Sequence, residues 1–208
     1  MAGTFSSAPR LLVLLLIVIA AVGCGVSTRV HAGETLPTLA ILPFEINDTS
    51  GEVGPDPHKE MLQRATGMIA TQIRDAGLFS VVPEAEIAQA IAAVNPGTYL
   101  RRCNGCERDI AARVDARYVL TAWINKVSTL VLTFNVDIRD VATGKSVYTR
   151  VLDFRGDNET AYTHAIKTMV RSLKQSMEER PRDFGGVGGT KTKIARPRQL
   201  TMAGRSAG

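Results

Sequence analysis

The chain has 208 residues, of which 45% are hydrophobic and 22% charged; these values are ordinary for a globular protein and exclude a chain that is disordered throughout. The net charge is +5, but the stretch from Arg180 onward contributes +6 and residues 1–32 contribute +2, which leaves −3 for the part between them. The positive charge therefore belongs to the two ends, and we expect no nucleic-acid partner.

The amino-terminal stretch has the layout of a bacterial export signal. Arg10 precedes an unbroken apolar run over residues 11–22, which is shorter than the roughly 20 residues of a membrane-spanning helix. Ala32 before Gly33 fits a signal-peptidase cleavage site. The alternative is lipidation at Cys24, because the residues before it resemble a lipobox in which Ala replaces the usual Leu. We expect a periplasmic or secreted protein or, with a lipid on Cys24, an outer-membrane lipoprotein, with no membrane span after processing.

The first part of the body predicts a strand, a loop and a helix. Residues 36–46 form a near-continuous apolar run typical of an interior strand, and Pro43 within it belongs at a strand end or a bulge. Residues 47–57 are rich in Gly, Pro, Asp and Asn and predict a loop. Apolar residues three and four apart predict a helix over 58–76, and Gly77 follows at the position of a C-cap.

A short strand and two more helices come next. Residues 78–82 predict the strand, and Pro83 opens a helix that ends at the Asn-Pro-Gly turn of residues 95–97. A third helix is predicted over residues 107–114, where the apolar side chains again fall on one side.

The second half of the body predicts three consecutive antiparallel strands and a helix that covers them. Residues 130–139 alternate between apolar and polar side chains, which is the period of a half-buried strand. Residues 118–124 and 147–154 are similar, and residues 142–145 form a hairpin turn before the last strand. The clearest helical stripe follows a cap at residue 157 or 158, and we expect it to cover the apolar face of these strands.

These elements predict a mixed α/β domain of the α+β class: a two-layer sandwich in which helices cover a mixed sheet of about five strands. The order is β-α-β-α-α-β-β-β-α, with a parallel pair joined to the antiparallel strands. We divide the chain into an export signal at 1–32, one domain at 33–178, and a disordered basic, Gly-rich tail at 179–208.

Four sequence blocks carry a resemblance to known families. They occur in order at residues 41–44, 76–83, 115–120 and 140–145. Together they resemble the amino-terminal domain of the Tol-Pal β-propeller protein and the related domain of curli-secretion lipoproteins. The Cys-Asn-Gly-Cys-Glu block before the strand of Trp123 is similar to a family of predicted secreted bacterial proteins of unknown function.

This resemblance spans about residues 37–177 and implies a fold, an envelope setting and other envelope proteins as partners. It does not imply an enzyme. No β-propeller repeats follow the domain, and the long membrane-spanning hairpins of curli-type pores are missing from the sequence. The family of unknown function supplies no site residues to transfer.

Cys103 and Cys106 remain after export processing, and three uses of their spacing stay open. A structural disulfide is the ordinary use in an oxidising compartment. A redox pair is the second, because a helix N-terminus lowers the pKa of a thiol, although no buried strand precedes the motif as in thioredoxin-like proteins. A metal site is the third, but it needs two further ligands, and the histidines are His31, His58 and His164.

Acidic residues gather in and beside the predicted loop: Glu45, Asp48, Glu52 and Asp56. Such a group could bind a cation or transfer protons, but the spacing of a calcium loop is missing and a solvated acidic loop is the simpler interpretation. We expect His164 at the surface of the last helix. The sequence contains no phosphate-binding loop or nucleophile motif, so we assign no catalytic residue, no metal and no cofactor.

The sequence therefore predicts a non-catalytic envelope module that binds another protein, with the edge of its open sheet as the candidate surface. The alternative is a thiol-redox or metal-handling accessory protein that acts through Cys103 and Cys106. A third hypothesis, binding of a small ligand between the long loop and the cysteine segment, also stays open.

Overall fold

A computed structural model describes residues 35–51, 58–97 and 99–185. Some predicted features lie outside these ranges: the export signal with Cys24, Ala32 and Gly33, the loop residues Glu52 and Asp56, and the tail from residue 186. None of the helices in the described ranges combines the length and the apolarity that crossing a bilayer requires.

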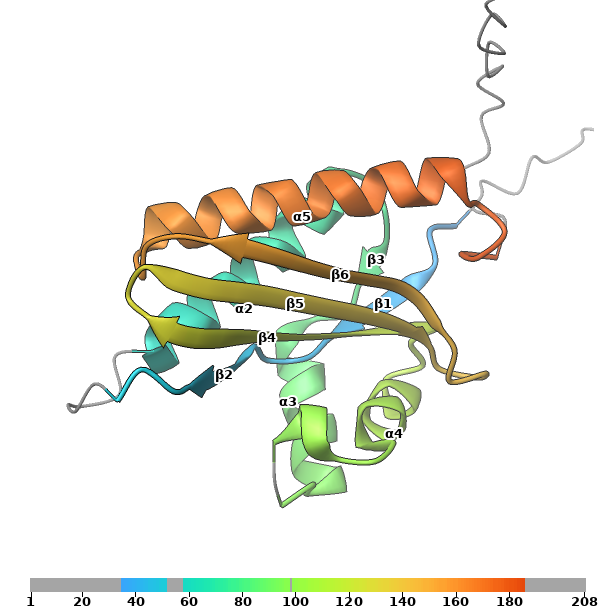
Figure 1. Ribbon diagram of the computed structural model, residues 1–208. Coiled ribbons are helices and arrows are strands. Elements are labelled where there is room, and N and C mark those ends of the chain that lie inside the picture. The colour runs from blue at the N-terminus through green and yellow to red at the C-terminus, as the bar shows by residue number, and fades with distance from the viewer. Residues whose placement is uncertain (1–34, 52–57, 98, 186–208) are drawn as a thin grey trace, which may run out of the picture. The chain divides into compact units, whose positions relative to one another are not determined.

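The described residues form a mixed sheet of six strands (Figure 1). The strands are β1 (Thr38–Ile41), β2 (Glu45–Asp48), β3 (Ser80–Val81), β4 (Tyr118–Ser128), β5 (Val131–Asp140) and β6 (Ser146–Phe154). The helices are α2 (His58–Asp75), α3 (Glu84–Val94), α4 (Cys106–Arg113) and α5 (Glu159–Glu179), with a short 3₁₀ turn, η1, at Leu100–Arg102. Apart from the division of the first strand, the predicted elements are present and their ends differ by a few residues.

The sheet has the order β3-β1-β4-β5-β6, and β2 also pairs with β4. β1 runs parallel to both of its neighbours, whereas β4, β5 and β6 are antiparallel. The predicted mixed α+β sandwich is therefore confirmed. The single strand expected over residues 36–46 is divided into β1 and β2, which both pair with β4. Pro43 lies in the break because it has no N–H to donate, so its predicted place at a strand end is confirmed.

The alternation of side chains along the strands produces two apolar clusters on opposite faces of the sheet. The larger cluster lies under α2 and α5 and includes Leu132, Phe134, Met169 and Leu173, so the expected cover of the sheet by the last helix is confirmed. The smaller cluster packs β1 and β4 against α3 and α4. Figure 1 shows α3 and α4 on the side of the sheet opposite α5. Most of the second face of β5 and β6 is left without a covering helix.

The two ends of α5 are held by specific contacts. Of the two predicted capping residues, Asn158 is the cap: its side chain accepts a hydrogen bond of 3.1 Å from the backbone N–H of Ala161. After the helix, the chain turns back and buries Phe184 completely against the rings of Phe79 and Tyr118. Phe184 thus packs in the main core although it follows the expected domain boundary at residue 178.

Candidate functional site

The structure places Cys103 and Cys106 side by side at the start of α4. Their Cα atoms are 5.5 Å apart and the two sulfurs are paired as a disulfide. Gly105 between them has a φ of 97°, a left-handed conformation that favours glycine and that turns the chain into the helix. The geometry fits the structural disulfide. The redox and metal uses of this pair stay predictions.

A cavity of about 750 Å³ opens beside the disulfide. One wall is the segment from Leu100 to Gly105, which includes η1 and the turn before α4. The floor is the uncovered face of the sheet, where Thr121 and Trp123 project from β4 and Thr149 from β6. This cavity lies between the cysteine segment and the sheet. Residues 52–57 of the long loop lie outside the described ranges, so the predicted pocket beside that loop stays a prediction.

Glu45 from β2 holds the wall of this cavity in place. Its carboxylate oxygens accept hydrogen bonds from the backbone N–H groups of Leu100, at 2.5 Å, and Arg101, at 3.3 Å. A carboxylate at the start of a helical turn satisfies N–H groups that have no partner within the turn. Glu45 was a candidate for cation binding or proton transfer, but in the structure its oxygens position η1.

Charged residues form a row along the floor of the cavity. The guanidinium of Arg139 donates to Asp137 at 2.5 Å and lies 3.5 Å from the Oε1 atom of Glu107. The hydrogen bond to Asp137 raises the pKa of Arg139 above its usual value. Asp137 also accepts hydrogen bonds from the hydroxyls of Ser146 and Thr149. Asp137 is thus satisfied by the protein itself.

Two residues that line the cavity, Glu107 and Arg101, each have a buried polar atom without such a partner. Glu107 is 7% exposed, and its second carboxylate oxygen, Oε2, has no hydrogen-bond partner among the described residues. The same holds for the Nη1 atom of Arg101, which is buried although the side chain is partly exposed. An unpaired buried polar group is uncommon in a native structure and is unfavourable, so these two atoms call for an explanation.

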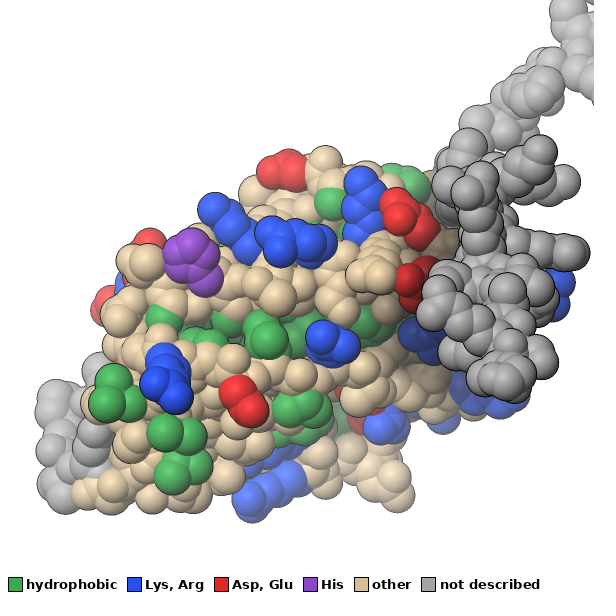
Figure 2. Space-filling view, turned by 45° about the horizontal axis from the view of Figure 1, so that its top comes forward, with side chains coloured by type: hydrophobic (Ala, Val, Ile, Leu, Met, Phe, Trp, Pro, Cys, Tyr) green, Lys and Arg blue, Asp and Glu red, His purple; other side chains and the backbone are tan. Residues whose placement is uncertain are grey.

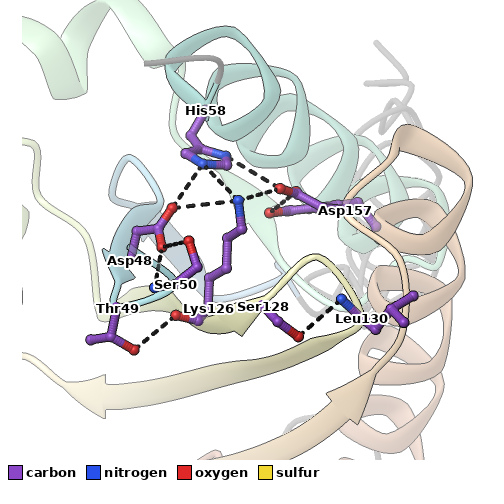
Figure 3. Close-up of polar contacts among 9 residues, drawn as sticks. Asp48, Thr49, Ser50, His58, Lys126, Ser128, Leu130 and Asp157 are labelled. Atoms are coloured by element: carbon purple, nitrogen blue, oxygen red, sulfur yellow. Dashed lines mark hydrogen bonds and ion pairs between the residues drawn. The ribbon is translucent and has the colours of Figure 1, made fainter. Parts of the chain in front are cut away.

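A second group of charges lies on the opposite face, at the end of the sheet near the start of α2 (Figure 3). Lys126 on β4 is 2% exposed, and its Nζ lies 2.9 Å from Oδ2 of Asp157 and 3.4 Å from Oδ2 of Asp48. The ring of His58 lies 3.2 Å from Asp48 and 3.4 Å from the Lys126 ammonium. The group therefore joins β2, α2, β4 and the segment before α5.

The electrostatics of this lysine cluster favour the charged form of Asp48. Hydrogen bonds from Ser50, with the positive charge of Lys126, lower the pKa of Asp48 to about 2, although its partial burial acts in the opposite direction. Burial and the neighbouring charge of Asp157 raise the pKa of Tyr162 well above its usual value. Lys126 thus has a carboxylate partner on each of two segments, Asp48 and Asp157, which offsets the cost of burying its ammonium.

Sequence reasoning missed Lys126, although a signal for its burial was present. The inward-facing positions of β4 are Tyr118, Leu120, Ala122 and Ile124, and Lys126 continues the same phase of the alternation. A lysine in that phase predicts a buried cation that needs acidic partners. His164 is exposed on α5 as expected. In the described ranges, no group of three or more His, Cys, Asp or Glu residues could hold a metal ion.

A protein-family model matches the part of the chain that contains both groups of residues. The model of the DUF3280 family, described as "Protein of unknown function (DUF2380)", matches residues 37–173, about two thirds of the chain. The chain belongs to this family. The membership predicted from the cysteine block is therefore confirmed. Both the cavity and the lysine cluster fall within the part of the chain that matches DUF3280, whereas Phe184 lies beyond it.

Several solved structures are similar to this DUF3280 chain. The C-terminal domain of LpoB from Salmonella enterica is 17% identical, with a TM-score of 0.40, and the match covers 59% of this chain and 85% of that domain. TolB from Acinetobacter baumannii is 16% identical, with a TM-score of 0.43, over 69% of this chain and 29% of TolB. The hypothetical protein CT253 from Chlamydia trachomatis is 13% identical, with a TM-score of 0.45, over 69% of this chain and 97% of that one. No curated protein matches significantly.

Proposed function

We propose that this protein is a non-catalytic accessory module of the bacterial cell envelope that binds another envelope protein along β6. The observation that carries the proposal is the position of β6 at the edge of the sheet. β6 pairs with β5 on one side, and no strand among the described residues pairs with its other side. An unpaired edge offers backbone N–H and C=O groups to an extended segment of another protein.

The side chains of β6 favour a particular kind of partner. Val151 is 57% exposed, and Arg150 beside it is exposed as well. Figure 2 looks onto the side of the molecule that carries α5 and shows a band of hydrophobic side chains with Lys and Arg on either side of it. A partner strand with apolar and acidic residues in alternation would match both features.

The sequence supports the envelope location. The apolar run behind Arg10 is the expected export signal, and the pairing of Cys103 with Cys106 suits an oxidising compartment. We propose cleavage between Ala32 and Gly33, with lipidation at Cys24 as the alternative. Labelling with a fatty-acid analogue distinguishes the two, since a mature chain that begins at Gly33 carries no label.

Site-specific crosslinking in cells tests the proposed binding surface. A photo-crosslinking amino acid is placed at position 151 on β6 or, for comparison, at position 86, which is exposed on α3. We expect position 151 to give one discrete crosslinked product with another envelope protein. Position 86 should not give this product, because α3 lies away from the β6 edge.

A charge reversal supplies the matched control for this experiment. Arg150→Glu places an acid opposite the acidic partner, so the crosslink from position 151 should be lost. Lys59→Glu makes the same change on the exposed start of α2 and should leave the crosslink unchanged. Equal crosslinking from both positions, or a product that is indifferent to Arg150→Glu, would contradict a partner at this edge.

A further inference from the structure

The cavity beside the disulfide contains side-chain groups that the protein leaves unsatisfied, and these groups define a ligand. We propose that the cavity binds a small carboxylate that carries a hydrogen-bond donor, a hydroxyl or an ammonium, close to the carboxylate. The proposal concerns the face of the sheet between η1 and β5 and does not depend on a protein partner at β6.

Glu107 indicates that the ligand carries a hydrogen-bond donor. Its side chain is 7% exposed, Oε1 is engaged by Arg139, and Oε2 has no partner among the described residues. A buried carboxylate oxygen without a donor is unfavourable, and a hydroxyl or ammonium group of a ligand would relieve that cost. Glu107 is one of the residues that line the cavity, so a small shift of its side chain would bring Oε2 to a ligand.

The arginines that line the cavity indicate that the ligand also carries a carboxylate. The guanidinium of Arg101 lies 5.0 Å from the centre of the Tyr99 ring, but its Nη1 atom is a buried donor without a hydrogen-bond partner in the described part of the chain. Arg102 lines the same wall. Arg139 already contacts Asp137 and Glu107. The lining therefore contains three guanidinium groups and two carboxylates, an excess of one positive charge that favours an anion.

The size and the supports of the cavity suit a small molecule. A volume of about 750 Å³ lies in the range of ligand pockets in proteins. The disulfide fixes the turn of the wall and Glu45 fixes η1, so the wall is held in shape before a ligand arrives. A wall that is already ordered loses little conformational freedom on binding, which favours affinity.

Trp123 makes the proposal directly testable, because it is the only tryptophan of the chain and lines the cavity. The purified protein is titrated with four probes while the fluorescence of Trp123 is followed, and calorimetry provides a second reading. Glucuronate carries a carboxylate with hydroxyls, and glycine carries an ammonium next to its carboxylate. Acetate has only the carboxylate, and glucose has only hydroxyls.

We expect a saturable response to at least one of the two bifunctional probes, with a Kd of about 1 mM or below, and binding at least about tenfold weaker for acetate and glucose. Tighter binding of glucuronate would assign the site to acidic sugars. Tighter binding of glycine would assign it to amino acids. Equal binding of all four probes, or no saturable response up to about 50 mM, would overturn the proposal.

Two variants test separately which residue binds the donor of the ligand and which binds its carboxylate. Glu107→Gln should weaken the bifunctional probe about tenfold and leave acetate unchanged, whereas Arg101→Met should weaken every probe that has a carboxylate. Glu178→Gln and Arg171→Met repeat these changes on exposed positions of α5 and should alter nothing. Arg101 is only partly buried, so we expect Arg101→Met to fold. It therefore tests the site even if Glu107→Gln does not fold. Unchanged affinities in Arg101→Met would also reject the site.

Discussion

The two faces of the sheet differ in whether their buried charged side chains have partners within the protein. On the face covered by α2 and α5, Lys126 is almost completely buried, yet Asp48, His58 and Asp157 surround its ammonium. On the other face, which we call the polar face and which carries the cavity, Glu107 is similarly buried but keeps one oxygen without a partner in the described structure. The same sheet thus contains one closed group, whose charged side chains are partnered within the protein, and one open group, in which a buried carboxylate oxygen has no partner in the described structure.

The difference separates structural charges from charges that await a ligand. A buried ion pair is tolerated only when its members satisfy one another, since each member alone would bear the full cost of desolvation. The lysine cluster meets this condition, and it joins segments that are distant in sequence. The polar face does not meet it, and the residues with unsatisfied atoms, Arg101 and Glu107, line an open cavity. Variants on the two faces should therefore differ in what they damage.

The largest effect is expected from Lys126→Met. Methionine fills a similar volume but leaves Asp157 and Asp48 without their cation, so we expect a loss of about 3 kcal/mol in the free energy of unfolding. Urea denaturation followed by circular dichroism measures this loss. Lys59→Met, on an exposed position of α2, should stay within about 0.5 kcal/mol of the parent. If Lys126→Met behaved like Lys59→Met, the cluster would not be the closed structural group described here.

The second largest loss of stability is expected from Phe184→Ala, and it tests where the domain ends. Phe184 is fully buried against Phe79 and Tyr118, so Phe184→Ala should destabilise the domain by about 3 kcal/mol through the cavity that it creates. The same denaturation experiment measures it. A chain that stops at residue 179 should lose a comparable amount. Full stability of that shortened chain would instead place the boundary at residue 178, as the sequence alone predicted.

The disulfide on the polar face should contribute less than the lysine cluster. Chain-entropy arguments give about 2 kcal/mol for a loop as short as that between Cys103 and Cys106. We expect the variant with both cysteines changed to Ser to fold, with an unfolding free energy lower by that amount. In the parent protein, the reduction potential of the Cys103–Cys106 bridge should lie far below that of glutathione, as for a structural disulfide. A potential near that of glutathione would revive the redox hypothesis.

Much of the fold could be predicted from the sequence because it depends on local periodicity. The alternation of apolar side chains in β5 and the stripe of α5 are each visible within one segment. The candidate site could not be predicted in this way. Glu107 and Arg139 are 32 residues apart, and their meeting depends on how α4 returns to the sheet. The sequence indicated the cysteine segment only through its spacing, which does not disclose the adjoining cavity.

Glu107→Gln should change stability far less than any of these variants. The amide keeps the volume and an oxygen acceptor for Arg139, and it removes a buried charge whose second oxygen has no protein partner, so the unfolding free energy should move by less than about 1 kcal/mol. Urea denaturation without ligand measures this. A loss as large as that of Lys126→Met would mean that Glu107 is a structural charge too, and the contrast between the faces would disappear.

The smallest effect concerns the pH dependence of the lysine cluster. Ser50 and Lys126 lower the pKa of Asp48 from 3.8 to about 2 in the folded protein. A carboxyl with a lower pKa in the folded state stabilises the fold above its unfolded pKa, and this stabilisation is lost as the pH falls from about 4 to about 2. Ser50→Ala removes the largest cause, so the pKa of Asp48 should rise towards 3.8 and its contribution should shrink.

An NMR titration of the Asp48 carboxyl carbon measures this shift, and Ser80→Ala, on an exposed position of β3, is the matched control. The stability of Ser50→Ala and of the parent should converge as the pH falls below about 2, because Asp48 is then protonated in both folded and unfolded chains. A stability difference that persists unchanged at low pH would show that Ser50 acts through the loop itself. In that case the closed cluster would owe its low-pH behaviour to residues other than Asp48.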